Sequence, residues 1–206
     1  MTKDFLKQSY HLGDVDHTRQ YYRDWSKSYD AEIIENGYQT PRRCAEALAR
    51  HLDDKSASVL DIGCGTGLSG LAFAEAGFTN LHGNDLSEEM LAQAKERNLY
   101  QNLELVDLNN PLAFAKGHYD AIAAVGVISV GHAPASTIKD MFAKLGDGGL
   151  FVFSINDPSL KEGSFTAAID ALLRQEDAHL KESHYDWHLP KIDMKSTVYV
   201  IEKIAT

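Results

Sequence analysis

The chain has 206 residues, 44% of them hydrophobic, which is typical of one compact domain with a sizeable core. Thirty acidic and twenty basic side chains give a formal net charge of -10, which disfavours a broad binding surface for nucleic acid or anionic lipid. The longest apolar run, residues 121–130, is about half of what a membrane-spanning helix needs, and the first eight residues contain no apolar signal core. We therefore expect a cytoplasmic protein that does not enter a membrane. The two cysteines, Cys44 and Cys64, indicate neither a disulfide framework nor a zinc site.

After a polar N-terminal stretch, short apolar runs alternate with segments of helical periodicity. Thr40 with Pro41 is typical of a helix start, and the amphipathic segment 41–52 follows. Ser87, followed by two glutamates, predicts another helix start, and Gly77 predicts a helix end. Strand-like and helical runs come in turn at residues 58–62, 68–77, 80–85, 87–98 and 102–107. This order predicts an α/β fold whose parallel sheet is covered on both faces.

The alternation continues through the second half of the chain, with a strand-like run at 119–130, a helical run at 136–145 and a strand-like run at 148–157. Apolar residues three or four apart then predict one long amphipathic helix from Phe165 to Leu180. The last two strand-like segments, 184–193 and 196–204, are close enough to pair as a terminal antiparallel hairpin.

A glycine-rich turn, VLDIGCGTGLSG at 59–70, joins the first predicted strand to the following helix. It contains G-x-G-x-G at Gly63, Gly65 and Gly67, and also G-x-G-x-x-G ending at Gly70, which is the spelling of a dinucleotide site. Glycines let the backbone approach a ligand closely, and the helix N-terminus offers unpaired N–H groups. The turn therefore predicts a nucleotide or nucleoside site.

Three acidic residues near strand ends narrow the choice of ligand. Asp85 ends the second strand, about 20 residues after the middle glycine, where a carboxylate accepts hydrogen bonds from ribose hydroxyls. Asp61 lies directly under the turn, and a carboxylate about 5 Å from a pyrophosphate charge would cost roughly 3 kcal/mol. S-adenosylmethionine (SAM) has no phosphate and brings a sulfonium and an amino cation to this end of the site. Asp107 ends the third strand, where it serves either as an acceptor for the adenine amino group or as a cap or turn residue.

Several motifs resemble, in order, those of class I SAM-dependent methyltransferases: D-I-G-C-G-T-G at 61–67, N-D-L-S at 84–87, V-D-L at 106–108, YDAIAAVGVIS at 119–129 and LGDGGLFVFSIN at 145–156. YYRDWSKSYD at 21–30 and GYQTPR at 37–42 resemble more closely the Williams-Beuren syndrome methyltransferase-like group. The resemblance implies a Rossmann-like fold with a seven-stranded, mostly parallel sheet. It also implies a methyltransferase domain at 41–206, with 1–40 as an N-terminal segment and lid of the same domain.

The resemblance further implies a site for SAM and its product S-adenosylhomocysteine (SAH). The glycines would cradle the amino-acid part, Asp85 would hold the ribose, and Asp107 with Leu108 would bound the adenine. Leu86 and Met90 would pack on the adenosine. Val125 and Gly126 would lie beside the bound cofactor. Cysteine in the turn is interpreted as a small residue, because nothing basic lies next to it in sequence. With the acid beneath the turn and the cysteine within it, the candidate cofactor-binding residues from here to the fourth strand are Asp61, Gly63, Cys64, Gly65, Gly67, Asp85, Leu86, Met90, Asp107, Leu108, Val125 and Gly126.

Aromatic residues recur at near-helical spacing in the N-terminal segment: Tyr21, Tyr22, Trp25 and Tyr29. This stripe either packs on the edge of the sheet or folds over the cofactor as a lid, with Tyr22, Trp25 and Tyr29 facing SAM. Aromatic faces suit a sulfonium because cation–π attraction persists where water is excluded. Both interpretations remain open for different residues.

Methyl transfer needs few dedicated catalytic groups, because holding donor and acceptor in line supplies about 7–11 kcal/mol of the barrier reduction. His132 is the one candidate general base, although a solvated loop histidine is the commoner case. Asn156 and Asp157 are interpreted as substrate contacts or, more commonly, loop caps. Residues 125–132 lack both the Asn/Asp-Pro-Pro-Tyr/Phe and the Pro-Cys patterns of nucleobase methylation. With the negative charge, this predicts a small-molecule acceptor and no nucleic-acid partner.

Two other functions are weighed against methyl transfer. An NAD(P)-dependent oxidoreductase would use the Y-x-x-x-K sequence at Tyr199 to Lys203, but in a strand these residues stand roughly 13 Å apart. The second alternative, a non-catalytic protein that binds SAM or SAH, remains open. The histidines at 184 and 188 fit no metal motif.

Overall fold

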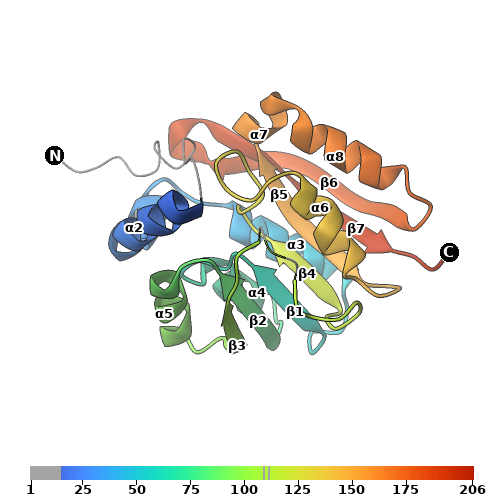
Figure 1. Cartoon of the computed structure of the whole chain (residues 1–206), viewed down its shortest axis with the longest axis horizontal. Helices are drawn as coiled ribbons and strands as arrows, with labels where there is room; N and C mark the ends of the chain where they lie inside the picture. Colours follow the sequence, from blue (N-terminus) through green and yellow to red (C-terminus); the bar gives the residue numbers. More distant parts are fainter. Residues whose placement is uncertain (1–14, 109, 111) are drawn as a thin grey trace.

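The computed structural model of the chain describes residues 15–108, 110 and 112–206 (Figure 1). Its helices are α2 (Val15–Glu35), α3 (Thr40–His51), α4 (Leu68–Glu75), α5 (Glu88–Glu96), α6 (Ser136–Ala143), α7 (Asp157–Glu162) and α8 (Ser164–Leu173), with the short 3-10 helix η2 (Pro190–Ile192). Its strands are β1 (Ser58–Ile62), β2 (Asn80–Asp85), β3 (Tyr100–Leu105), β4 (Ala121–Ala124), β5 (Leu150–Asn156), β6 (Ala178–Leu189) and β7 (Met194–Lys203). Within these described residues, no helix is long and apolar enough to span a bilayer.

All the strands belong to one seven-stranded sheet in the order β3-β2-β1-β4-β5-β7-β6. The first five strands in this order run parallel, and β7 is antiparallel to both of its neighbours. The expected α/β fold, with its mostly parallel sheet and terminal antiparallel hairpin, is confirmed. The strand order reverses at β1, so the carboxyl ends of β1, β2 and β4 surround the point where open α/β sheets bind ligands.

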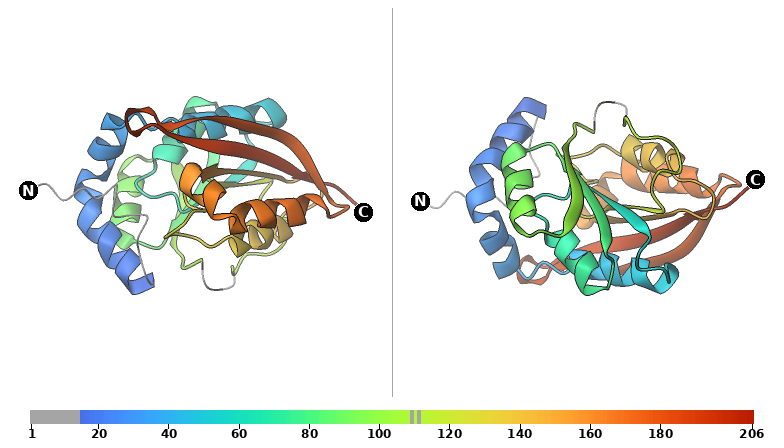
Figure 2. Two further views of the ribbon diagram at one scale, coloured as in Figure 1. Left: turned by 90° about the horizontal axis from the view of Figure 1, so that it is seen from above. Right: turned by 90° about the horizontal axis from the view of Figure 1, so that it is seen from below.

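The core lies on both faces of the sheet because its central strands are apolar on both faces. Along β5, Phe151 and Phe153 pack with α6 and α8, whereas Leu150 and Val152 pack on the opposite face with α3 and α4. The two views in Figure 2 show these helix pairs on opposite sides of the sheet. This alternation follows from the two-residue period of a strand.

The prediction of one long helix from Phe165 to Leu180 is wrong for its second half. Helix α8 ends at Leu173, and Leu180 lies in β6 with 39% of its surface exposed. Residues from Ala178 onward pair with β7, and Asp177 accepts a hydrogen bond from Lys203 Nζ at 2.8 Å. The apolar spacing continued past the end of the helix, but the pairing with β7 decided the conformation.

The expected starts and ends of three helices are confirmed in position. Ser87 caps α5 by accepting a hydrogen bond from the Met90 N–H, and Gly77 has a φ of +98° just after α4. Helix α3 begins at Thr40, but the Thr40 hydroxyl does not cap it. This hydroxyl lies 2.7 Å from His188 Nδ1 in β6 instead, so it joins the helix to the hairpin.

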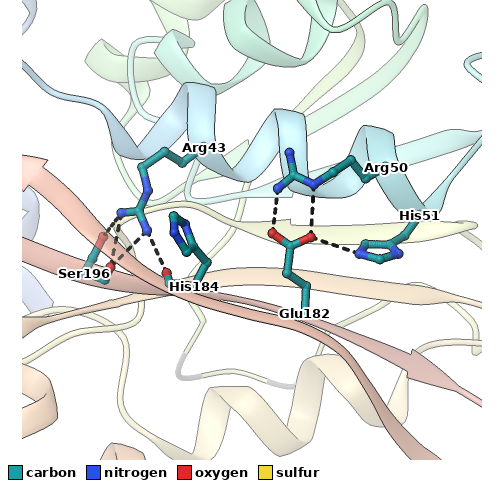
Figure 3. Close-up of polar contacts among 6 residues, drawn as sticks. All are labelled: Arg43, Arg50, His51, Glu182, His184 and Ser196. Carbon is teal, nitrogen blue, oxygen red and sulfur yellow. Dashed lines mark hydrogen bonds and ion pairs between the residues drawn. The ribbon is translucent and has the colours of Figure 1, made fainter.

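Helix α3 is fixed to the hairpin mainly by Arg43, which is almost fully buried (Figure 3). Its guanidinium donates to the Ser196 hydroxyl at 2.9 Å and to backbone carbonyls of both hairpin strands, those of residues 184, 186, 187 and 196. About two turns further along the helix, Arg50 and His51 both contact the carboxylate of Glu182. The hairpin is thus held to the rest of the sheet by side chains of α3 as well as by β5.

Candidate functional site

The glycine turn between β1 and α4 has a backbone that requires glycine. Gly63, Gly65 and Gly67 all have positive φ angles, of 63°, 55° and 88°. A Cβ on Gly63 would lie 2.4 Å from Val127 Cγ2, which no side chain tolerates. A Cβ on Gly65 would meet nothing within 4 Å, because this residue faces open space. The turn therefore presents bare backbone towards an open volume.

That volume is a pocket of about 510 Å³ beside the carboxyl ends of the parallel strands. Eleven of the sequence-predicted residues line it: Tyr29, Gly63, Gly65, Asp85, Leu86, Met90, Asp107, Leu108, Val125, Gly126 and His132. Four others are not in its wall: Trp25, Asp61, Cys64 and Gly67. The side chain of Tyr22 lies outside the described part of the chain. One end of the pocket thus gathers the residues expected at the cofactor.

Asp85 connects this wall to the glycine turn. One of its carboxylate oxygens accepts from the Gly65 N–H and the other from the Ser87 N–H, both at 2.9 Å. Burial raises the pKa of Asp85, and these backbone N–H groups oppose the rise by stabilising the charged form. Each carboxylate oxygen has a second lone pair, so the same side chain can also accept from hydroxyls in the pocket.

Asn84 also holds the turn, and the sequence analysis did not single it out. Its side-chain oxygen accepts from the Gly63 N–H at 3.2 Å and its carbonyl accepts from the Cys64 N–H at 2.8 Å. Cys64 packs inside, where burial raises the pKa of its thiol and keeps it in the unreactive protonated form. The N-D-L-S motif contained the signal for Asn84, since it places an amide directly before the acid that ends β2.

Asp61 lies beneath the turn, at 0% exposure, behind the pocket wall. One carboxylate oxygen accepts from the hydroxyls of Ser69 at 2.6 Å and Tyr100 at 2.7 Å. The other oxygen has no hydrogen-bond partner among the residues that the structure describes. Burial raises the pKa of Asp61 to about 7. A buried carboxyl with one unpartnered oxygen is costly for the fold.

We expect the free energy of unfolding to report this carboxyl through its pH dependence. Because the folded chain keeps a proton that the unfolded chain loses above about pH 4, the contribution of Asp61 falls as pH rises from there to about 7, and then stays constant. His132 and His188, whose pKa values are lowered, change the stability in the opposite direction, so the informative quantity is the difference between wild type and Asp61→Asn, measured by urea unfolding without ligand. Relative to Asp61→Asn, the wild type should lose about 2 to 3 kcal/mol between pH 5 and pH 8. The exposed Asp53→Asn serves as control, and an unchanged pH dependence in Asp61→Asn would refute the assignment.

The aromatic stripe of α2 divides between pocket and core. Tyr29 lines the pocket, whereas Trp25 is 2% exposed and packs in a cluster with Tyr21, Ile33 and Leu189. The Trp25 indole N–H donates to Glu32 Oε2 at 2.8 Å within the same helix. The expectation that Trp25 faces the cofactor is therefore not met, because the indole fills the space between α2 and the hairpin.

The rest of the pocket wall is formed by residues after β4, at the end of α7 and at the start of α8, including His132, Glu162 and Phe165. His132 is not a solvated loop residue, because it lies in the wall with Nδ1 at 2.9 Å from the Ser129 hydroxyl and 3.2 Å from the Val130 carbonyl oxygen. Burial lowers the pKa of His132 to about 4. Its imidazole is therefore neutral at physiological pH, which is the form that accepts a proton.

Asn156 and Asp157, the other polar candidates, lie outside the pocket wall and act as structural groups. Asn156 Oδ1 caps α7 by accepting from the Ser159 N–H and hydroxyl. Asp157 accepts from the Tyr185 hydroxyl and from the Lys195 N–H, both in the hairpin. Of the two interpretations given to these residues, the structure supports the cap.

The residues of the oxidoreductase alternative do not form a site. Tyr199 and Lys203 both lie in β7, and Lys203 Nζ donates to Asp177 Oδ2 at 2.8 Å. His188 is buried against Thr40, and burial lowers its pKa to about 4. These groups are used in packing the hairpin.

Comparison with known proteins identifies the family of this chain. Residues 37–200 match the family model of the methyltransferase domain. Methyltransferase-like protein 27 of Homo sapiens is 31% identical over 191 residues, 91% of this chain and 77% of that protein, which confirms the resemblance to the Williams-Beuren group. An 18S rRNA (guanine-N(7))-methyltransferase of Bos taurus is 32% identical over 115 residues, but these are 56% of this chain and 38% of that relative. In structure, the chain resembles magnesium protoporphyrin IX methyltransferase from Synechocystis with bound SAH, with a TM-score of 0.68, 18% identity, and coverage of 93% and 100% of the two chains.

Proposed function

We propose, from the premise that this chain belongs to the SAM-dependent methyltransferase family, that its methyl acceptor is a small, uncharged or cationic molecule bound beside His132. The observation that carries the proposal is the composition of the pocket wall. Its charged members among the described residues are the acids Asp85, Asp107 and Glu162, and the histidine in it is neutral. Asp85 and Asp107 are expected at the donor, which leaves Glu162 and the neutral His132 for the acceptor. These two residues disfavour a phosphate or carboxylate group on the acceptor and favour an apolar or basic molecule.

The residues present fit SAM as the donor. Gly65 leaves the space of a side chain empty on the pocket side, and the lone pairs of Asp85 suit ribose hydroxyls. Asp61, fully buried behind the glycine turn, would attract the amino cation of SAM across the turn without touching it. The pyrophosphate of NAD would instead bring negative charge towards this carboxyl, which is a further argument against the oxidoreductase alternative.

SAM supplies a methyl group on a sulfonium, which is already a good leaving group. The work of the protein is then to hold the acceptor in line and to exclude water, and such positioning contributes about 7–11 kcal/mol. His132, neutral and in the wall, would take the proton that the acceptor releases as its bond to the methyl group forms. Tyr29 covers the pocket from α2.

RNA is the alternative acceptor, because one relative is an 18S rRNA methyltransferase. Proteins that bind nucleic acid need basic surfaces to neutralise phosphates, and this chain has a net charge of -10. The acidic wall of the pocket adds to that argument. The small-molecule acceptor is therefore the better supported of the two.

The test measures SAH formation from SAM in the presence of either the ultrafiltered small-molecule fraction of a cell extract or purified ribosomal RNA. Turnover with the small-molecule fraction alone is expected. With the acceptor identified, His132→Gln should lower kcat about 100-fold with unchanged SAH affinity, because the variant removes a proton acceptor and leaves the donor end intact. In the wild type, the contribution of His132 should stay constant from pH 6 to pH 8, since its pKa of about 4 keeps it neutral throughout.

Turnover with RNA alone would refute the small-molecule acceptor. Binding of SAH with no turnover by either fraction would favour the non-catalytic alternative. An inflection near pH 6.5 that His132→Gln removes would show that His132 is solvated and not buried in the wall.

A further inference from the structure

A polar contact joins α2 to the glycine turn and to the end of α5, and we propose that it acts as a latch that positions Tyr29 over the cofactor and slows cofactor exchange. The contact, called the lid latch below, consists of Asp30 on α2, Thr66 in the glycine turn and Arg97 at the C-terminal end of α5. The inference rests on the proposed position of the adenosyl cofactor in the pocket. It does not depend on the identity of the acceptor.

Each member of the lid latch contacts the other two. The Thr66 hydroxyl donates to one carboxylate oxygen of Asp30 at 2.5 Å, and Arg97 Nη2 forms an ion pair with the other. Arg97 Nε donates to the Thr66 carbonyl at 2.6 Å. The planar guanidinium reaches a carboxylate and a carbonyl together, which a lysine ammonium on its flexible stem does less well.

The surroundings make this contact stronger than an ordinary surface ion pair. The side chains of Asp30 and Arg97 are 30% and 25% exposed, and Thr66 is buried. Partial burial and charge-assisted hydrogen bonds both raise the strength of such a group above that of exposed pairs. The stem of Arg97 also packs on Gly67, where an added Cβ would lie 3.0 Å from Arg97 Cδ.

The lid latch is one residue away from the pocket wall on two of its three elements. Asp30 follows Tyr29, and Thr66 follows Gly65, and both of these preceding residues line the pocket. Helix α2 lies against α5 in both views of Figure 2. A movement of α2 away from α5 would therefore open the latch and withdraw Tyr29 from the wall together.

The population of the closed lid then sets the affinity for the cofactor. When only a fraction of the molecules has the binding-competent arrangement, the apparent dissociation constant rises by the inverse of that fraction. Loss of a partly buried charged hydrogen bond is enough to lower that fraction about tenfold. Since the contacts hold the lid closed, most of the change should fall on the rate of SAH release.

The experiment follows SAH release through the fluorescence of Trp25. The chain has two tryptophans, and Trp187→Phe removes the exposed one on β6, which leaves Trp25 in α2 as the reporter. In this background, Asp30→Asn and Arg97→Met should each raise the dissociation constant and the release rate of SAH about tenfold. The double variant should bind SAH with the same affinity as either single variant, because each single substitution already removes the same contact between Asp30 and Arg97. Arg97→Lys, which retains the ion pair, should fall between wild type and Arg97→Met.

The matched control is Glu35→Gln, which removes one negative charge from an exposed position of the same helix and should leave SAH binding unchanged. Thermal unfolding without ligand checks that the variants fold. If the folded Asp30 and Arg97 variants bind and release SAH as the wild type does, the lid latch is refuted and the cofactor site stands. If the wild type itself fails to bind SAH, both the cofactor site and the lid latch are refuted.

Discussion

Replacing Asp85 with alanine is expected to weaken SAM binding about 100-fold, or roughly 3 kcal/mol. Two losses combine in this variant. The pocket loses the carboxylate proposed to accept from the ribose, and the Gly65 N–H loses the acceptor that holds it at 2.9 Å. Asp85→Asn should recover only part of the affinity, because an amide offers one oxygen where two N–H groups now donate to two oxygens. Isothermal titration with SAM and SAH measures both variants.

The control for Asp85 is Glu75→Ala, which removes an exposed acid from α4 and should leave the affinity unchanged. Titration with NAD provides the second comparison. Unchanged SAM affinity in a folded Asp85→Ala variant would remove Asp85 from the cofactor site. Binding of NAD in place of SAM would mean that the turn is a dinucleotide site, as its G-x-G-x-x-G pattern indicates.

Replacing Arg43 with methionine should lower the free energy of unfolding by about 4 kcal/mol. The variant removes a buried guanidinium that donates to carbonyls on both hairpin strands and to the Ser196 hydroxyl. Methionine fills a similar space but donates nothing, so the Ser196 hydroxyl and the carbonyls that rely on this guanidinium lose a donor inside the protein. Urea unfolding followed by circular dichroism gives the difference. Arg43→Lys should lose less, because an ammonium keeps part of the donor set.

Arg42→Met is the matched control, because Arg42 is the neighbouring residue on the same helix but is exposed and pairs with Glu46 one turn away. Its loss should stay below about 1 kcal/mol, as for other exposed pairs. Equal losses in the two variants would mean that the hairpin does not depend on Arg43. A large loss in Arg43→Met alone would identify α3 as the anchor of the hairpin.

Much of the pocket could be predicted from the sequence because it depends on short-range order. Strand and helix periods place the glycine turn between β1 and α4, and the carboxyl ends of neighbouring parallel strands meet at one edge of the sheet. Asp85 and Asp107 both lie in the pocket wall for this reason.

The sequence failed where a residue's position depends on a distant partner. Trp25 and Tyr29 belong to the same aromatic stripe of α2. Trp25 nevertheless packs in a buried cluster with Leu189 of the hairpin, whereas Tyr29 lines the pocket. The end of α8 was decided by the pairing of β6 with β7, which outweighed a continuing apolar period. His132 was judged by its loop position, but its pocket surroundings lower its pKa.

By itself, the sequence determined the fold class, the order of the cofactor motifs and the family, because each is carried by local periods and by residues a few positions apart. Only the tertiary structure decided that Asp61 is buried with an unpartnered oxygen, that Arg43 holds the hairpin, and that Asp30 meets Arg97 across 67 positions. These arrangements exist because the folded chain brings distant segments together and removes their polar groups from water. A polar group that is buried in this way is stabilised by a partner within the protein.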